Sequence, residues 1–335
     1  MVTRREIFRQ IKGPDTNSPP KAILSLVLLI VLIASLANGT AWAGLTDAQC
    51  ERVRHLHGEY GRELCRQTLA NPESGRLQFA LAALWLNERV TEGNKKLREL
   101  HAAALAGNEE KNIPSSKVMT PLHASGVKWA MRGWLRVYYM FNSKSRFFPG
   151  RLAPDVQAML EEMFWNYGCY KSTVERSQPK YIWFIQGSEN HDMMDLSNAF
   201  LALQTVQDLS EYRSRKLPDG HTAAKHVTAW TQYYKRYCQV RIQRGLFVEM
   251  SPTYGKYFLP ELVNMYEFAG DAELQRLMEM LLHTTWADWA IDQLGGIRGG
   301  AKTRVYQGHY AQRGTSDSWS FLGRILTGQG DFFQT

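Results

Sequence analysis

Several signatures of common protein classes are missing from this chain of 335 residues. Its four cysteines form neither a CxxC pair nor a zinc-finger spacing, and no HExxH motif occurs, so the familiar zinc sites are unsupported. Neither a GxxxxGKS/T loop nor a GxGxxG turn is present, which excludes the P-loop and dinucleotide-binding classes. No repeat of fixed period occurs, which disfavours the common α-solenoid families.

A long apolar run is also missing, because the uncharged stretch over residues 22–37 is shorter than the ~20 residues that a bilayer-spanning helix needs. A basic segment precedes this stretch, and Ala41-Trp42-Ala43 follows it as a small-x-small cleavage site. This order is typical of a secretory signal peptide, with an uncleaved membrane anchor as the alternative. We therefore expect residues 1–43 to be removed and residues 44–335 to form one periplasmic or secreted domain without stable membrane insertion.

The four cysteines could form two disulfide bridges. In an oxidising compartment Cys50 can pair with Cys65 across a helical hairpin, and Cys169 with Cys238 across the core. The sequence does not decide between these disulfides and buried free thiols.

The net charge is +8, and it is unevenly distributed. Residues 1–43 hold five Lys/Arg and two Asp/Glu, or +3, so the remainder carries +5. Nine basic and two acidic residues lie between Arg213 and Lys256, and four basic residues without an acid lie between Ile297 and Arg313. A basic cleft attracts polyanions, and for an exported protein we expect acidic polysaccharide rather than nucleic acid.

The remainder of the chain has apolar residues at three-to-four spacing, which predicts an all-α protein of paired antiparallel helices. Short strand candidates lie only at 181–185 and 246–250. The expected helices cover residues 45–69, 75–90, 94–106, 121–141, 154–170, 192–209, 221–244 and 260–268, with one or two more over 271–293.

Polar residues gather just before the helix expected at 192–209. Glu189, Asn190, His191 and Asp192 place an amide, an imidazole and two carboxylates at its start, behind an aromatic segment that contains Trp183. Capping by Ser188 or Asn190 explains Ser, Asn and Asp without any function, but it does not explain the histidine. A metal site of these residues has no supporting ligand spacing.

Two later segments are candidates for the same site. Tyr254 and Tyr257 lie in a turn where Arg241, Arg244 and Lys256 would lower the pKa of a phenol, which suits it to acid–base catalysis. Four glycines at 295–300 allow close backbone approach to a ligand. The basic residues of that segment suit carboxylate or sulphate binding; they are Arg298, Lys302 and Arg304. The alternative for the tyrosine segment is an ordinary turn, and the alternative for the glycine-rich segment is a solvated loop.

With these residues in place, the segment 183–306 resembles the α/α-toroid polysaccharide lyases of the alginate lyase and heparinase type. The resemblance implies an incomplete (α/α) toroid and β-elimination on a uronic-acid polysaccharide, without a metal or organic cofactor. It implies that Asn190 neutralises the carboxylate, that His191 is base or stabiliser, that Tyr254 is acid, and that Arg244 assists. The expected substrate contacts are Glu189, Tyr257, Lys256, Trp183, Arg298, Lys302 and Arg304.

Two departures from the lyase pattern stand out. The interval from His191 to Tyr254 is long, so Tyr257 stays open as a substitute. Many lyases of this type carry a β-sheet domain after the toroid, and this chain stops at Thr335, so we expect that domain to be missing.

Two other functions fit the same residues. A glycoside hydrolase on a helical ring needs two carboxyl groups, with Glu189, Asp192 and Glu249 as candidates. A non-enzymatic binder of acidic glycans needs only the basic cleft. The oligomeric state, and whether cleavage is internal or terminal, stay open.

Overall fold

The computed structural model describes residues 61–71, 76–110, 127–185, 187–245, 247, 255–294 and 297–298, with isolated residues between 47 and 59. The predicted signal segment 1–43 and its cleavage site lie outside the described residues.

The described part of the chain is helical, which confirms the all-α prediction. Its strands are β1 (Gln293–Leu294) and β2 (Ile297–Arg298), which pair as a two-residue antiparallel ladder. The α-helices are α4 (Gly61–Ala70), α5 (Arg76–Leu86), α6 (Val90–Glu110), α7 (Val127–Phe141), α8 (Pro154–Lys171), α9 (Glu189–Val206), α10 (Ala223–Arg244), α11 (Gly255–Phe268) and α12 (Ala272–Asp292), with the 3-10 turns η2 (Glu175–Ser177) and η3 (Pro179–Tyr181).

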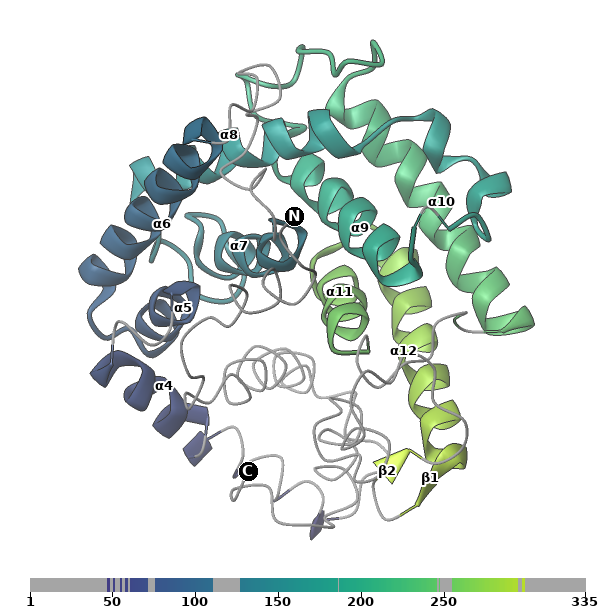
Figure 1. Cartoon of the computed structure of the whole chain (residues 1–335), viewed down its shortest axis with the longest axis horizontal. Helices are drawn as coiled ribbons and strands as arrows, with labels where there is room; N and C mark the ends of the chain where they lie inside the picture. The colour runs from purple at the N-terminus through teal and green to yellow at the C-terminus, as the bar shows by residue number, and fades with distance from the viewer. Residues whose placement is uncertain are drawn as a thin grey trace, which may run out of the picture.

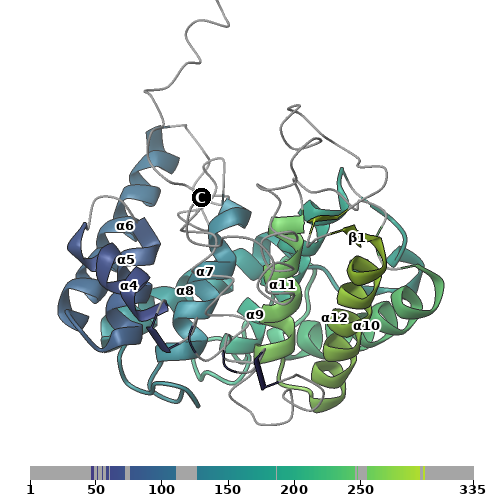
Figure 2. The same cartoon turned by 90° about the horizontal axis from the view of Figure 1, so that it is seen from below.

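These helices form an inner and an outer layer (Figure 1). Helices α5, α7, α9 and α11 lie inside, and α4, α6, α8, α10 and α12 follow the outside as an arc. Figure 2 shows α9 and α11 side by side in the second view. Helix α9 packs against α7, α8, α10 and α11, so neighbours from four parts of the chain hold it in the interior.

The contact between α8 and α9 is especially close. A Cβ atom at Gly168 would overlap the side chain of Leu203, so glycine is required where these helices meet. Leu203 itself is fully buried, as are Phe200 and Val206 on the same helix. Burial of such side chains contributes roughly 1.5–3 kcal/mol each, which fixes α9 in the interior.

A buried polar cluster joins α7 to α11 beside α9. Arg136 Nη2 lies 2.6 Å from Glu267 Oε2 and donates to Asn264 Oδ1 at 2.7 Å. Arg132 lies 3.7 Å from Glu261, a fully buried carboxyl group. Burial raises the pKa of Glu261 to about 8, although Arg132 favours the anion. Burial therefore favours the protonated form of Glu261, which limits the charge held in the core.

Two predicted helix starts are corrected by the structure. Helix α9 begins at Glu189 rather than at residue 192, so Glu189, Asn190 and His191 lie in its first turn. Helix α11 begins at Gly255 rather than at Pro260, which it contains as an interior residue. The first turn of α11 thus includes part of the segment that we expected to be a loop.

The predicted strand at 181–185 is wrong. Pro179 starts the 3-10 turn η3, and the Ile182 N–H donates to the Pro179 carbonyl, so the backbone is tightly turned here. The other strand candidate, 246–250, lies almost wholly outside the described residues.

Of the two alternatives for Cys169 and Cys238, the structure shows free thiols rather than a disulfide, and Cys65 is also free. Cys238 Sγ contacts Met278 Sδ at 3.6 Å within the core. Burial raises the pKa of the Cys65 and Cys238 thiols to about 12, so they are unreactive packing residues. Cys50 lies outside the described residues.

The described helices are too short or too polar to cross a membrane.

A hydrogen-bonded chain ties the end of α8 to the start of α10. Trp230 Nε1 donates to Ser172 Oγ at 2.8 Å, Ser172 Oγ lies 2.8 Å from His226 Nδ1, and His226 Nε2 lies 2.9 Å from Asp219 Oδ1. Because the Asp219 carboxylate can only accept, the neutral imidazole carries its proton on Nε2, and Nδ1 accepts from the Ser172 hydroxyl. His226 is fully buried, and burial lowers its pKa despite the neighbouring carboxylate.

We therefore expect His226 to make the fold sensitive to acid. Its pKa is lower in the folded state than the unfolded value of roughly 6.5, so the unfolded chain binds more protons between the two values. The free energy of unfolding should fall as the pH drops below that unfolded value, by at most about 1.4 kcal/mol per pH unit for this group. Urea unfolding at a series of pH values from about 8 to about 5 measures the slope, because this range brackets the ordinary histidine pKa.

The matched control is His221, which is exposed. His226→Gln should flatten the slope and His221→Gln should leave it unchanged. Equal slopes in His226→Gln and the unsubstituted chain would contradict the lowered pKa of His226 in the folded state.

Candidate functional site

The first turn of α9 holds four of the predicted site residues: Glu189, Asn190, His191 and Asp192. Gly187 has φ of +97°, a backbone conformation that favours glycine, and it leads into Ser188 at the N-cap position. The Ser188 side chain makes no hydrogen bond to the helix backbone, and its Oγ instead donates to Asn190 Oδ1 at 2.6 Å. Ser188 thus fixes the orientation of the Asn190 amide.

Asn190 is left with a donor that the described residues do not use. Its side chain is only 2% exposed, and no acceptor among the described residues lies within hydrogen-bond distance of Nδ2. A buried donor without an acceptor destabilises the fold by roughly 1–3 kcal/mol, so a ligand that accepts from it gains this energy. The positive end of the α9 dipole favours an anionic acceptor here.

A buried ion pair holds the neighbouring residue Glu189. Arg241 Nη1 lies 2.6 Å from Glu189 Oε1, and both side chains are at most 5% exposed. The same guanidinium donates from Nη2 to the Ile182 carbonyl at 3.1 Å and stacks over the Trp183 ring at 4.0 Å. Arg241 thus connects α10 to the first turn of α9 and to the aromatic segment before it.

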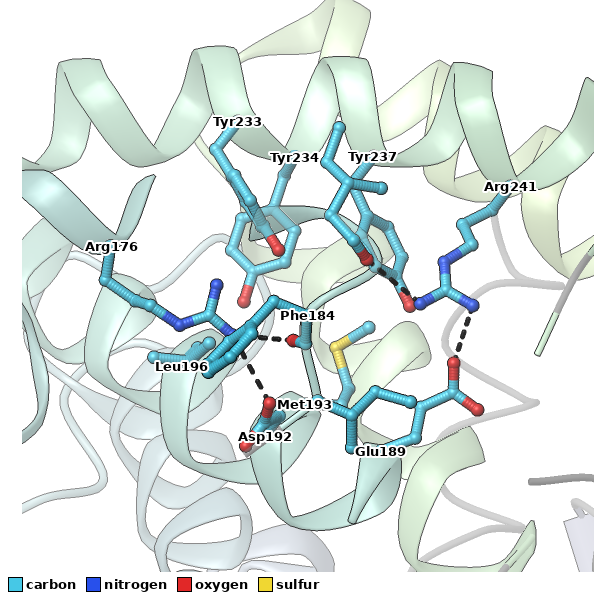
Figure 3. Close-up of a pocket in the computed structure, with 12 residues that line it drawn as sticks. Arg176, Phe184, Glu189, Asp192, Met193, Leu196, Tyr233, Tyr234, Tyr237 and Arg241 are labelled. Carbon is cyan, nitrogen blue, oxygen red and sulfur yellow. Dashed lines mark hydrogen bonds and ion pairs between the residues drawn. The ribbon is translucent and has the colours of Figure 1, made fainter. Parts of the chain in front are cut away.

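A second arginine repeats this arrangement one turn along α9 (Figure 3). Arg176 Nη2 lies 3.3 Å from Asp192 Oδ2 and donates to the Phe184 carbonyl at 3.0 Å. Its guanidinium lies 5.2 Å from the centre of the Phe184 ring and 4.9 Å from that of Tyr181. Each arginine therefore combines a carboxylate of α9 with a ring of the segment 181–184.

A small cavity lies between the two ion pairs, with α10 above it in Figure 3. Its volume is about 30 Å³, which admits water but not a sugar ring in this conformation. Burial raises the pKa of Tyr233, although Arg176 and Arg241 oppose this, and it raises the pKa of Tyr234 and Tyr237 well above the ordinary value. These phenols are protonated at neutral pH and can donate hydrogen bonds.

The other predicted site residues are placed as follows. His191 is half-buried in the first turn of α9, beside Asn190. Arg244 is exposed at the last position of α10, and Trp183 is 43% exposed. Lys256 and Tyr257 belong to the first turn of α11 and Arg298 to β2, with their side chains outside the description. Tyr254, Glu249, Lys302 and Arg304 lie outside the described residues.

Sequence reasoning missed the roles of Arg176 and Arg241. It treated Arg241 only as a neighbour that would tune a phenol. A signal was present, because Tyr233, Tyr237 and Arg241 recur every four residues on the buried face of α10. An arginine on such a face needs a buried carboxylate partner. Arg176 and Phe184 had no comparable pattern.

The described residues contain no group of three or more His, Cys, Asp and Glu side chains that could hold a metal ion. Comparison with known proteins adds no relative: no family model, curated protein or solved structure matches the chain.

We expect the buried ion pair to be essential for stability. Arg241→Met leaves Glu189 as a buried charge without its guanidinium, which should lower the free energy of unfolding by about 3–5 kcal/mol. Arg236→Met changes an exposed arginine on the same helix and should shift it by no more than about 0.5 kcal/mol. Chemical denaturation measures both.

The double variant Glu189→Leu, Arg241→Met removes both charges and should recover much of the loss. If Arg241→Met were no less stable than Arg236→Met, the pair would not hold this site together.

Proposed function

We propose that the protein is an exported polysaccharide lyase, a carbon–oxygen lyase that cleaves a uronic-acid polysaccharide by β-elimination. Its two helical layers are proposed to be an incomplete (α/α) toroid, as in the alginate lyase and heparinase type that the sequence resembles. The proposed substrate is an acidic polysaccharide, and the chemistry requires no metal or organic cofactor.

The observation that supports this proposal best is the amide of Asn190. β-Elimination begins with loss of the proton on C5 of the uronate, and negative charge then develops on the carboxylate. Nδ2 of Asn190 is a fixed, buried donor at the positive end of α9, and it carries no charge of its own. Preorganised donors toward developing charge change rates by roughly 10²–10³.

The proton transfers are assigned to the neighbours of Asn190. His191 follows it in the first turn of α9, and we propose it as base or stabiliser of the reaction. We propose Tyr254 as the acid that protonates the leaving oxygen, with Tyr257 as its substitute and Arg244 as the assisting arginine. Arg244 is exposed at the end of α10, three residues after Arg241, where it is accessible to a polymer.

The competing hydrolase has less support. A retaining or inverting hydrolase needs one carboxyl group that keeps its proton. Glu189 and Asp192, its two candidates among the described residues, each lie against an arginine guanidinium, which favours the ionised form. The non-enzymatic binder differs from the lyase only in turnover, so an activity measurement separates them.

We expect the protein to generate an unsaturated uronate from at least one polymer in a panel of alginate, polygalacturonate, heparin and chondroitin. The new C4–C5 double bond absorbs in the ultraviolet, so the reaction can be followed directly. Asn190→Ala removes the donor and should lower kcat/KM by about 10²–10³, and Tyr254→Phe should abolish proton donation.

Asn142→Ala is the control, because it removes an amide from the end of α7, away from the site. It should retain activity. Failure of a folded, full-length protein to produce the absorbance from any polymer would reject the lyase, as would full activity in Asn190→Ala.

A further inference from the structure

Two large aromatic side chains next to the site are strongly exposed. Trp183 is 43% exposed and Phe184 is 51% exposed, although each belongs to a residue type that is usually mostly buried. Phe184 also lines the cavity beside α9, so its ring lies at the boundary between cavity and solvent. Adjacent exposed rings of this kind are typical of a surface that binds something.

Both rings are held in place from one side. The Arg241 guanidinium lies 4.0 Å from the centre of the Trp183 ring, and that of Arg176 lies 5.2 Å from the centre of Phe184. Each guanidinium is in turn fixed by an ion pair to α9. Because a cation covers one face of each ring, a ligand can reach the other face, and little conformational entropy is lost when it binds.

The charges around the rings decide what kind of group fits there. The charged residues that line the cavity are Arg176 and Arg241 with Asp192 and Glu189, so they balance to zero. An anion gains little from this balanced surface, whereas the apolar C–H face of a sugar ring gains by leaving water. An anionic group would instead accept a hydrogen bond from Nδ2 of Asn190, the donor that no described residue uses.

We infer that Trp183 and Phe184 form a stacking subsite for one pyranose ring of an acidic saccharide whose carboxylate is bound by Asn190. This inference rests on the proposed function, because it takes the Asn190 amide as the carboxylate site. The Trp183 ring is linked to the first turn of α9, because the arginine under it pairs with Glu189, the chain neighbour of Asn190. Arg176 and Arg241 are positioning residues for the rings.

Affinity electrophoresis tests the subsite, with the full-length protein run through gels that contain alginate, polygalacturonate, heparin or chondroitin. Trp183→Ala and Phe184→Ala should each weaken retardation by the bound polymer about tenfold, as truncation of an aromatic anchor does. Trp183→Phe and Phe184→Tyr keep a ring and should bind nearly as the unsubstituted protein does. Thermal unfolding checks that all variants are folded.

Tyr170 is the matched control, because it is 46% exposed and stacked against a cation, Lys171, at 4.7 Å. Tyr170→Ala should bind normally, and an equal loss in this variant would overturn the subsite. Normal binding by both alanine variants, with loss in Asn190→Ala, would overturn the stacking subsite and leave the proposed function intact. Loss in the ring variants but not in Asn190→Ala would support stacking and reject the carboxylate site. Retention by no polymer would reject both.

Discussion

The ion pair between Arg241 and Glu189 is the interaction on which the candidate site depends. Removing both ions from water is unfavourable, and the pair is stable only because its geometry is close and further contacts satisfy the guanidinium. Those contacts come from the Ile182 carbonyl and the Trp183 ring. One guanidinium thus sets the relative positions of α10, the start of α9 and the aromatic segment between η3 and α9.

This constraint explains why the amide of Asn190 can be preorganised. The residue before it in the helix is fixed by Arg241, and Ser188 holds its Oδ1. An amide fixed on both sides does not need to reorganise when charge develops nearby, which is the condition under which a donor accelerates a reaction. The second pair, Arg176 with Asp192, extends the same rigidity one turn further along α9.

The distribution of positive charge follows from these pairs. The sequence predicts a basic cleft from the excess between Arg213 and Lys256. In the described part of this segment, Arg241 lines the cavity but is neutralised by Glu189, and Lys235 pairs with Asp271 and Glu273. The exposed basic residues lie outside the cavity lining; they are Arg213, Arg215, Lys216, Lys225, Arg236 and Arg244. If the proposed substrate is correct, such charges would steer the polyanion to the surface, and we propose that selection within the site falls to the amide and the rings.

Helical periodicity was enough to predict the all-α class, because apolar residues at three-to-four spacing bury one face of each helix. It placed the start of α8 at Pro154 and the end of α10 at Arg244 correctly. It failed at the starts of α9 and α11, where polar residues and Pro260 resemble breakers although packing extends the helices.

Asn190 and His191 could be singled out from composition alone, since an imidazole beside an amide exceeds what a helix cap requires. Their partners could not be predicted, because Arg241 and Arg176 lie far from them in sequence and only tertiary packing brings them together. The free thiols could not be predicted for the same reason. Whether two cysteines form a disulfide depends on the distance between them in the fold, which their spacing in the sequence does not determine.

The central claim is that Asn190 recognises a carboxylate, and a thermodynamic cycle tests it most directly. We would measure the affinity of the unsubstituted protein and of Asn190→Ala for a uronate oligosaccharide and for the same oligosaccharide with its carboxyl groups reduced to alcohols. The account predicts that the unsubstituted protein prefers the acidic ligand and that Asn190→Ala loses most of this preference. An equal preference in both proteins would mean that the carboxylate is bound elsewhere.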